Sequence, residues 1–456
     1  MLSSVLSSVA VTSTASAGGG ALFEPPTNLP NVCGGGNGCW TNYLRVSDLD
    51  GDHQLDLVVV NMQGLFEVGE AEPLVIFRND PAGTFGNISA QAIDSHEVQN
   101  RQVAVGDVDG DGDPDIYAPH AAGGVDTLFL NDGTATFEAI EIDNQSRAGG
   151  ARLGDLDDDG DLDLFLTDGY GEQNEPVSPA AHIFLNDGTG GFSELADAAP
   201  PSVMGTEPID VDLFDADGDF DLDVLIDSHA GAVSLWLNNG DATFGDASDS
   251  VPTSPGLHYN PAACDVDGDG DLDFWVDNAG PDYTEQLHIN DGSGAFTDET
   301  AARVTGNVEG DNGGDDNGVI CADLDYDGDF DAVVVALFTP ERYLENDGTG
   351  TFVSIPDVFP GGGPLQFGGD STLWAEMGDV DGDGRLDIVT GAGESASVDS
   401  FYLGAEAQLV DATGPGFRAV EQLDGVALDT AVILHFAVTD NTVTDEGPRL
   451  DRAFVR

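Results

Sequence analysis

The chain has 456 residues, of which 86 are acidic and 12 are basic, giving a formal net charge of −74. This charge repels phosphate backbones and anionic membrane surfaces, which excludes nucleic acid as a partner. No run approaches the roughly 18 uninterrupted apolar residues of a membrane-spanning helix. An apolar fraction of 40% is enough for a real core, and four Cys are too few for a disulfide-built scaffold.

Residues 1–20 resemble the end of a secretory signal. A weakly apolar, Ser-rich run leads to the small-residue site Ala15-Ser16-Ala17 before Gly18, but the usual positively charged start is missing. The segment is therefore predicted to be either a signal peptide or a flexible tail. We favour export, which would place the protein outside the cell, either secreted or at the cell surface.

One phrase recurs seven times and makes internal repetition the dominant feature of the chain. Its copies are DLDGDHQLD, DVDGDGDPD, DLDDDGDLD, DADGDFDLD, DVDGDGDLD, DLDYDGDFD and DVDGDGRLD, beginning at Asp48, Asp107, Asp155, Asp215, Asp265, Asp323 and Asp379. Successive copies start 59, 48, 60, 50, 58 and 56 residues apart. We call each copy an Asp loop and number its residues 1–9.

A second phrase follows each of the first six copies. These phrases are FRNDPAGTF, FLNDGTATF, FLNDGTGGF, WLNNGDATF, HINDGSGAF and LENDGTGTF, and after the seventh copy the phrase decays to DATGPGF. Asn-Asp-Gly between apolar runs predicts a hairpin turn, because these residues tolerate positive φ. Short runs of β-forming residues flank every Asp loop. Four antiparallel strands per repeat predict an all-β, seven-bladed β-propeller over residues 21–422.

The Asp loops carry acids at positions 1, 3, 5 and 9. Alternate carboxylates on a tightly turning backbone converge on one point, and the carbonyl at position 7 can join them. Two carboxylates 4 Å apart repel by roughly 4 kcal/mol at an effective dielectric near 20, so a closed loop requires a cation. An all-oxygen shell favours Ca²⁺ before Mg²⁺. We therefore predict up to seven Ca²⁺ sites.

The predicted metal-site residues occupy positions 1, 3, 5, 7 and 9 of the seven loops. They are Asp48, Asp50, Asp52 and Asp56; Asp107, Asp109, Asp111, Asp113 and Asp115; Asp155, Asp157, Asp159, Asp161 and Asp163; Asp215, Asp217, Asp219, Asp221 and Asp223; Asp265, Asp267, Asp269, Asp271 and Asp273; Asp323, Asp325, Asp327, Asp329 and Asp331; and Asp379, Asp381, Asp383, Arg385 and Asp387. An EF-hand is rejected, because it needs a Glu at position 12 and a following helix.

The seven D-x-D-x-D-G-x-x-D phrases with their G-x-G-x-F hairpins resemble the FG-GAP/VCBS repeats of the integrin α-subunit propeller and of many bacterial secreted proteins. The resemblance covers roughly Leu22 to Arg418. It implies an Asp loop between the first and second strands of each blade that binds Ca²⁺ through positions 1, 3, 5, 7 and 9. In the fifth copy these ligands would be the side chains of Asp265, Asp267, Asp269 and Asp273 and the carbonyl of Asp271.

Position 6 departs from Gly in two loops. Five copies have Gly there, whereas the first has His53 and the fourth has Phe220. If position 6 needs a left-handed backbone, these two loops are either strained or differently shaped. We expect weaker metal sites in blades 1 and 4. Arg385 at position 7 of the last copy is harmless if only its carbonyl is used.

The four Cys form two pairs in the sequence. Cys33 and Cys39 flank a short Gly-rich loop, and a small disulfide is favoured there over free thiols. Cys264 and Cys321 each precede an Asp loop, but their offsets from it differ by one residue. Their side chains are therefore expected to face opposite ways, and we predict buried thiols rather than a bridge.

Two segments compete to complete blade 7. The segment from Ala21 to Val32 resembles the Phe-led outer strands and could close the ring, or Phe417–Gln422 could complete the blade without it. The remainder, residues 423–456, resembles the opening of a bacterial Ig-like domain but is too short for a complete sandwich. We predict it to be an appendage.

The face opposite the Asp loops carries the longest and most variable segments. They are Asn61–Pro73, Asp168–Ala181, Asp246–Pro261, Arg303–Gly318 and Asp357–Asp370. Recognition loops vary in this way, so an unknown protein or carbohydrate ligand is expected on this face. The favoured function is a Ca²⁺-binding scaffold for binding or adhesion. The alternatives are a secreted enzyme acting on polysaccharide, as a lyase or hydrolase, and a spacer within a larger surface protein.

Overall fold

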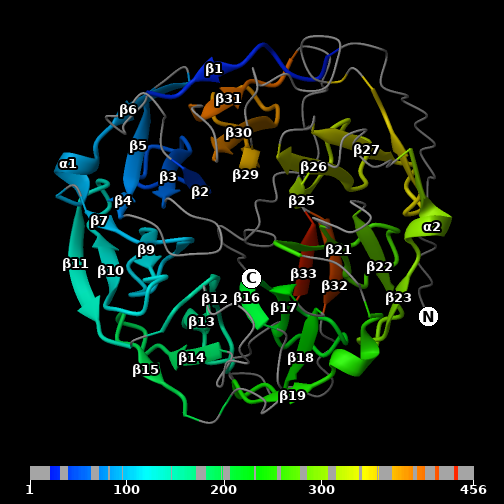
Figure 1. Ribbon diagram of the computed structural model, residues 1–456, viewed down its shortest axis with the longest axis horizontal. Helices are drawn as coiled ribbons and strands as arrows, with labels where there is room; N and C mark the ends of the chain where they lie inside the picture. Colours follow the sequence, from blue (N-terminus) through cyan, green and yellow to red (C-terminus); the bar gives the residue numbers. More distant parts are fainter. Residues whose placement is uncertain are drawn as a thin grey trace, which may run out of the picture.

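The computed structural model of the protein describes residues 21–30, 40–62, 71–80, 83–94, 96–144, 146–170, 181–196, 198, 206–230, 233–253, 258–277, 285–306, 315–337, 341–356, 358, 372–393, 398–405, 416–420 and 436–439. The fold is a ring of seven antiparallel sheets, as predicted (Figure 1). Each sheet is one blade, and the chain passes around the ring from blade 1 to blade 7.

The first four blades each contain four consecutive strands that pair as neighbours, apart from the short β4 between the second and third strands of blade 1. Their strands are β2 Thr41–Ser47, β3 Asp56–Asn61, β5 Val75–Asp80 and β6 Thr84–Asn87; β8 Ala104–Gly106, β9 Asp115–Ala118, β10 Asp126–Asn131 and β11 Phe137–Ile142; β12 Ala151–Gly154, β13 Asp163–Thr167, β14 Ala181–Leu185 and β15 Ser193–Glu194; and β16 Thr206–Phe214, β17 Asp223–Ala230, β18 Ser234–Asn238 and β19 Phe244–Asp246.

Blades 5 to 7 follow the same plan with small additions. Their strands are β20 Pro261–Cys264, β21 Asp273–Val276, β22 Gln286–Asn290 and β23 Phe296–Asp298; β25 Asp315–Ala322, β26 Asp331–Leu337, β27 Arg342–Asn346 and β28 Phe352–Ser354; and β29 Thr372–Gly378, β30 Asp387–Ala392 and β31 Ser400–Tyr402. In blade 6 the short β24 (Val304–Thr305) lies parallel to β28.

The remaining elements are short. They are β4 Glu72–Pro73 paired with β7 Glu97–Val98, β32 Gly416–Val420 paired with β33 Phe436–Thr439, the helices α1 Ser89–Ala92 and α2 Thr300–Arg303, and a 3₁₀ turn at Ser248–Ser250. No helix in the described part of the chain has the length and apolarity to cross a membrane.

The N-terminal segment closes the ring. Strand β1 (Thr27–Asn28) pairs with β31 as the outermost strand of blade 7, so the first and last parts of the propeller lie side by side (Figure 1). This confirms one of the two predicted closures. Strand β32 pairs with β33 in a separate two-stranded sheet instead of completing blade 7. The predicted signal segment 1–20 lies outside the described residues, as does most of 423–456.

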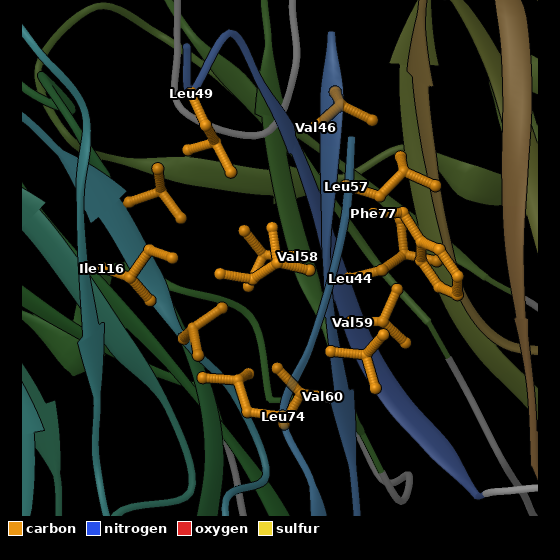
Figure 2. Packing of buried hydrophobic residues seen from close by; sticks show 14 of the residues in the cluster. Leu44, Val46, Leu49, Leu57, Val58, Val59, Val60, Leu74, Phe77 and Ile116 are labelled. Atoms are coloured by element: carbon orange, nitrogen blue, oxygen red, sulfur yellow. The ribbon is translucent and has the colours of Figure 1, made fainter. Parts of the chain in front are cut away.

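The core lies between neighbouring blades, because each second strand is buried on both faces. In β3, Leu57, Val58, Val59 and Val60 are all at most 1% exposed. Leu57 and Val59 point to one side of the sheet and Val58 and Val60 to the other (Figure 2). Such strands are continuous apolar runs rather than alternating ones, as expected for a sheet covered on both faces.

Face-to-face packing of blades also fixes which residues meet across an interface. A Cβ added to Gly106, at the end of β8, would lie 3.3 Å from Leu153 of blade 3. Gly154 faces Leu213 of blade 4 in the same way, at 2.9 Å. The last residue of one first strand therefore meets the second-to-last residue of the next. Consecutive residues of a strand point to opposite faces of its sheet. The last residue of one strand and the second-to-last residue of the next therefore point towards each other across the interface between their blades.

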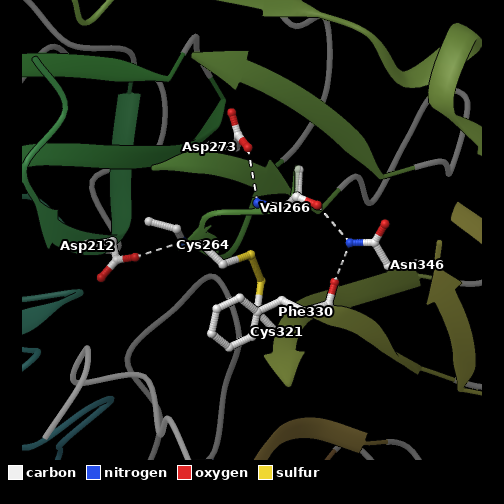
Figure 3. Close-up of a disulfide and its surroundings, with 8 residues drawn as sticks. Asp212, Cys264, Val266, Asp273, Cys321, Phe330 and Asn346 are labelled. Atoms are coloured by element: carbon white, nitrogen blue, oxygen red, sulfur yellow. Dashed lines mark hydrogen bonds between the residues drawn. A yellow bond between two sulfur atoms is a disulfide. The ribbon is translucent and has the colours of Figure 1, made fainter. Parts of the chain in front are cut away.

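The prediction of buried thiols at Cys264 and Cys321 is wrong. The two residues form a disulfide between blades 5 and 6, with their Cα atoms 6.5 Å apart (Figure 3). Cys264 ends β20, and Cys321 is the second-to-last residue of β25. Their side chains do point to opposite faces of their own sheets, but neighbouring blades present opposite faces to each other. Cys33 and Cys39 lie outside the described residues.

Candidate metal centres

The Asp loops share one backbone conformation. Each connects the first and second strands of its blade, and in all seven the residues at positions 4 and 6 have positive φ. Glycine fills most of these places, but His53 and Phe220 adopt φ of 69° and 74° at position 6. Loops 1 and 4 therefore keep the backbone shape of the other five loops and are strained at position 6. Position 4 has the same requirement, which the sequence analysis missed, and Asp158 and Tyr326 meet it with φ of 65° and 58°.

Carboxylates converge within each of the first five loops. In blades 1 to 4 the acids at positions 1, 3 and 9 offer oxygen atoms within 4.8 Å of one another, and in blade 5 those at positions 1, 3 and 5 do so. The groups are Asp48, Asp50 and Asp56; Asp107, Asp109 and Asp115; Asp155, Asp157 and Asp163; Asp215, Asp217 and Asp223; and Asp265, Asp267 and Asp269. The structure thus brings together three of the predicted side chains in each of these five loops, while their role as ligands stays a prediction.

The acid at position 1 organises the loop. In blade 2, Asp107 Oδ1 accepts hydrogen bonds from the main-chain N–H groups of Gly110 and Asp111, at 2.8 and 3.1 Å. Its Oδ2 accepts from the N–H of Gly112 at 2.9 Å. The same carboxylate pattern recurs at Asp48 and Asp379. These bonds need the left-handed residues at positions 4 and 6, which turn successive N–H groups inward.

The acid at position 3 is left incompletely satisfied. One buried oxygen of each of Asp50, Asp157, Asp217 and Asp267 has no hydrogen-bond partner. Burial, followed by the neighbouring carboxylate at position 5, raises the pKa of Asp157 and Asp217 above its usual value. An unpartnered carboxylate oxygen beside other carboxylates is the donor that a hard cation such as Ca²⁺ takes. The residues present therefore fit the predicted ion.

The acid at position 9 has a different role, because main-chain groups occupy both of its oxygens. In every blade Oδ2 accepts from the N–H of position 2, at 2.8–3.1 Å. Oδ1 accepts from the first residue of the following turn, at 2.6–2.9 Å. Burial raises the pKa of these acids, to about 6 for Asp115 and Asp163 and about 7 for Asp56. Position 9 thus ties the Asp loop to the turn beside it.

The acid at position 7 points away from the carboxylate group. A Cβ added to Gly188 would lie 2.5 Å from Asp161 Oδ2, and one at Gly240 would lie 2.7 Å from Asp221 Oδ2. The side chain therefore rests over the Gly of the Asn-Asp-Gly turn. This placement leaves only the carbonyl of position 7 available to the loop centre, as the resemblance implied, and it explains why the turn needs Gly.

The turn Asn links each blade to the one before it, a function that sequence reasoning did not identify. Its Nδ2 donates to the carbonyl at position 2 of the preceding loop, at 2.5–2.9 Å, in Asn79, Asn131, Asn186, Asn238, Asn290 and Asn346. Figure 3 shows this bond from Asn346 to Val266. Recurrence of Asn at one place in every turn was the available signal.

One interface lacks this Asn and uses a different side chain. In blade 7, Gly404 occupies the position of the turn Asn and donates to Asp387 Oδ1. The hydroxyl of Tyr326, at position 4 of the blade 6 loop, instead accepts from the N–H of Leu386 in blade 7, at 2.8 Å. Tyr326 thus spans the one blade interface without the Asn bond.

Arginines approach three of the loops. Arg78 Nη1 lies 3.9 Å from Asp50 Oδ2 in blade 1. Arg303 of α2 has Nη2 3.2 Å from Asp267 Oδ2 and donates to the carbonyl of Thr349. Arg385, at position 7 of the last loop, pairs with Asp383. These guanidinium groups neutralise part of the charge in blades 1, 5 and 7, so the seven loops are not electrostatically equal.

The geometry defines a class: a seven-bladed β-propeller whose blades each carry an Asp-rich loop on the same face. The FG-GAP-like repeat family matches residues 48–118, 155–226 and 224–276. The propeller therefore contains FG-GAP-like repeats over these residues. A search of curated protein sequences finds no match.

Solved structures show the same fold. A lectin of Agrocybe aegerita, described as recognising non-reducing terminal N-acetylglucosamine, is 20% identical, with a TM-score of 0.50 over 80% of this chain and 94% of the lectin chain. BBS1N, solved in complex with ARL6DN, is 8% identical, with a TM-score of 0.51 over 86% of this chain and all of that one. At these identities the likeness shows the fold alone.

Proposed function

We propose that this protein is a Ca²⁺-stabilised binding scaffold, secreted or displayed at the cell surface, which holds a carbohydrate or protein ligand on the face opposite the Asp loops. The observation that carries the proposal is the repeated loop with one backbone conformation and converging carboxylates. Such loops are useful where Ca²⁺ is millimolar, because extracellular modules bind it at roughly 10⁻⁴–10⁻³ M.

Bound Ca²⁺ would neutralise the acids at positions 1, 3 and 5, which repel one another in its absence. Position 9 would contribute an oxygen while keeping its main-chain bonds. The disulfide between Cys264 and Cys321 supports an oxidising compartment, since such bonds persist mainly outside the cytosol. Ion binding and the disulfide would act together to make the ring rigid, and a rigid platform binds a ligand with little ordering cost.

A small hollow at the starts of the first strands, with room for about one water molecule, lies at the end of the blades away from the Asp loops. Its lining comes from blades 1, 2, 5, 6 and 7 and consists of Asn42, Tyr43, Arg101, Gln102, Tyr259, Asn317, Leu373 and Trp374. Each of these residues lies at or before the beginning of a first strand, and hence at the end away from the Asp loop. Tyr43 and Trp374 are buried with their ring centroids 4.4 Å apart, so the hollow itself is too small for a sugar and the proposed ligand would bind above it. The fold of the Agrocybe lectin makes glycans ending in N-acetylglucosamine the first ligands to test.

The ion is tested by chelation. Each filled site adds about 2.7 kcal/mol when free Ca²⁺ exceeds its Kd 100-fold. Removing Ca²⁺ with EGTA should therefore lower the melting temperature by about 10 °C or more, and added Ca²⁺ should restore it. Identical melting curves with and without EGTA would contradict the proposed role of the loops.

The ligand is tested separately. The Ca²⁺-loaded protein should bind a subset of a glycan array or of extracellular proteins, and binding should weaken after EGTA treatment. A polysaccharide turnover screen with the same preparation tests the enzymatic alternative. Turnover in the absence of Ca²⁺-dependent binding would replace the scaffold function with an enzymatic one.

A further inference from the structure

Two buried acids stand apart from the repeat. Asp227 in β17 and Asp277 just after β21 occupy equivalent places in blades 4 and 5, beyond the apolar part of the second strand. The other blades have Val60, Pro119, Thr167, Val335 and Gly391 there. The propeller therefore does not need an acid at this place. Asp227 and Asp277 each lie four residues after position 9 of their loops, about 13 Å along the strand.

Strand pairing and hydrogen bonds bring the two acids into one cluster. Asp227 is directly opposite Asp210 in the pairing of β16 with β17. Asp210 Oδ2 accepts from Asn260 Nδ2 at 3.2 Å. The main-chain N–H groups of Tyr259 and Asn260 both donate to Asp277 Oδ1, at 2.8 and 3.0 Å. Asn260 thus connects the blade 4 acids to Asp277.

The oxygens that remain have no partner. Asp227 is 0% exposed and neither of its carboxylate oxygens accepts a hydrogen bond; Asp277 is also 0% exposed and its Oδ2 accepts none. The charge of Asp227 raises the pKa of Asp277, after burial itself, and Asp210 acts on Asp227 in the same way. Burying a carboxylate without any partner is among the costliest arrangements in a protein interior.

The nearby guanidinium groups already have partners: Arg101 donates to the carbonyls of Gly149 and Ile209, and two others pair with acids. Arg152 Nη2 lies 3.3 Å from Asp210 Oδ1. Arg342 Nη2 lies 2.6 Å from Glu285 and 2.8 Å from Asp316. The ring of His258 contacts the carbonyl of Asp277, through Nδ1 at 2.7 Å. Within the described residues, no side chain donates a hydrogen bond to either carboxylate oxygen of Asp227 or to Oδ2 of Asp277.

We propose that Asp227 and Asp277 hold a hard cation of the Ca²⁺ class at a site between blades 4 and 5, separate from the Asp loops. The donors are carboxylate oxygens alone, which suit Ca²⁺ and exclude soft metals. A divalent ion would offset the charges of both acids, and water would complete its shell. The site would join two blades through their second strands, far from the loop face.

The experiment counts ions on the full chain. Metal-free wild-type protein is dialysed to equilibrium against Ca²⁺, and its Ca²⁺ content is compared with that of Asp227→Asn. The variant should contain one ion fewer per chain. Asp217→Asn, at position 3 of the blade 4 loop, should also lose one ion, and the double variant should lose two. Glu138→Gln, on the outer strand of blade 2, should lose none.

Asp227→Asn also distinguishes a bound cation from protonation of the Asp227 carboxylate. If Asp227 is simply protonated, Asn mimics it closely, and the variant keeps the full ion content and its stability. That result would overturn the proposal while leaving the loop sites intact. Because a variant can fail to fold, wild-type crystals grown with Mn²⁺ give an independent measurement. An anomalous peak between Asp227 and Asp277 is expected, and peaks confined to the Asp loops would refute the site.

Discussion

Neighbouring blades are held together by two kinds of contact, one repeated around the ring and one individual to each interface. At the Asp-loop end, the same bond recurs, from a turn Asn to the preceding loop, with Tyr326 replacing it between blades 6 and 7. Along the first strands, each join is individual: Arg45 pairs with Glu376 at 2.5 Å between blades 1 and 7, and Cys264 is bonded to Cys321 between blades 5 and 6. Repetition gives every interface the same spacing, whereas individual contacts distinguish one interface from another.

The largest expected single-residue effect is at the repeated end. Asp331 accepts hydrogen bonds from Leu324 N–H, Asn346 N–H and the hydroxyl of Tyr343, at 2.9–3.0 Å. Asp331→Ala leaves these buried donors unpaired and should cost about 4 kcal/mol in the free energy of unfolding. Urea denaturation of the wild type and the variant measures this difference in the free energy of unfolding.

The same series separates position 9 from position 3. In EGTA, Asp331→Ala should keep its full cost, because its partners are two main-chain N–H groups and the Tyr343 hydroxyl, none of which depends on the ion. Asp325→Ala should cost nothing or stabilise in EGTA, since it removes repulsion within the loop, and should destabilise only when Ca²⁺ is present. If Asp331→Ala also cost nothing in EGTA and destabilised the protein only with Ca²⁺ present, position 9 would act only through the ion.

The next effect concerns an individual join. The double variant Cys264→Ser/Cys321→Ser opens a link between residues 57 apart in the chain. It should lower the free energy of unfolding by about 3 kcal/mol, because the unfolded chain regains the freedom of that loop. A reducing agent should destabilise the wild type by a similar amount and leave the variant unchanged. A wild type insensitive to reduction would argue against the bridge.

The disulfide marks where sequence reasoning ends. Blade number, strand order and loop position follow from the repeat, because each copy imposes the same pattern of turns and buried strands. Cys264 and Cys321 have no counterparts in the other copies of the repeat. The prediction for them compared the two faces of a single sheet, whereas the disulfide joins the facing sides of two neighbouring sheets. Asp227 and Asp277 are likewise hidden in a sequence rich in acids, and only burial and missing partners distinguish them.

A smaller effect is expected where a single residue departs from the repeat in the core. His288 is 1% exposed, stacks on Phe274 with ring centroids 4.7 Å apart, and has no hydrogen-bond partner. Burial lowers its pKa from 6.5 to about 4. The unfolded chain therefore binds more protons than the folded one between these values, so stability is full above pH 6.5 and falls as pH drops towards 4.

Replacing His288 by Phe, which blades 1 to 3 have at this place, should remove that loss. At pH 5 the variant should gain about 2 kcal/mol over wild type relative to their difference at pH 8. Both proteins are measured at one Ca²⁺ concentration, so that changes in ion binding cancel. Parallel stability curves for the two proteins across this range would show that His288 does not titrate in this way.

The smallest effect tests the strain in an Asp loop. His53 holds φ of 69° at position 6, where five other loops have Gly, and its side chain is 95% exposed. His53→Gly should stabilise the folded protein by about 1 kcal/mol, because Gly adopts this backbone without steric cost. Gly112→Ala, at the same place in blade 2 with φ of 97°, should destabilise by a similar amount. Since the strained backbone supplies the N–H groups that orient Asp48, relief of strain should also strengthen Ca²⁺ binding in blade 1, measured by calorimetry. Unchanged affinity with increased stability would separate loop strain from ion binding and remove the basis for expecting a weaker site there.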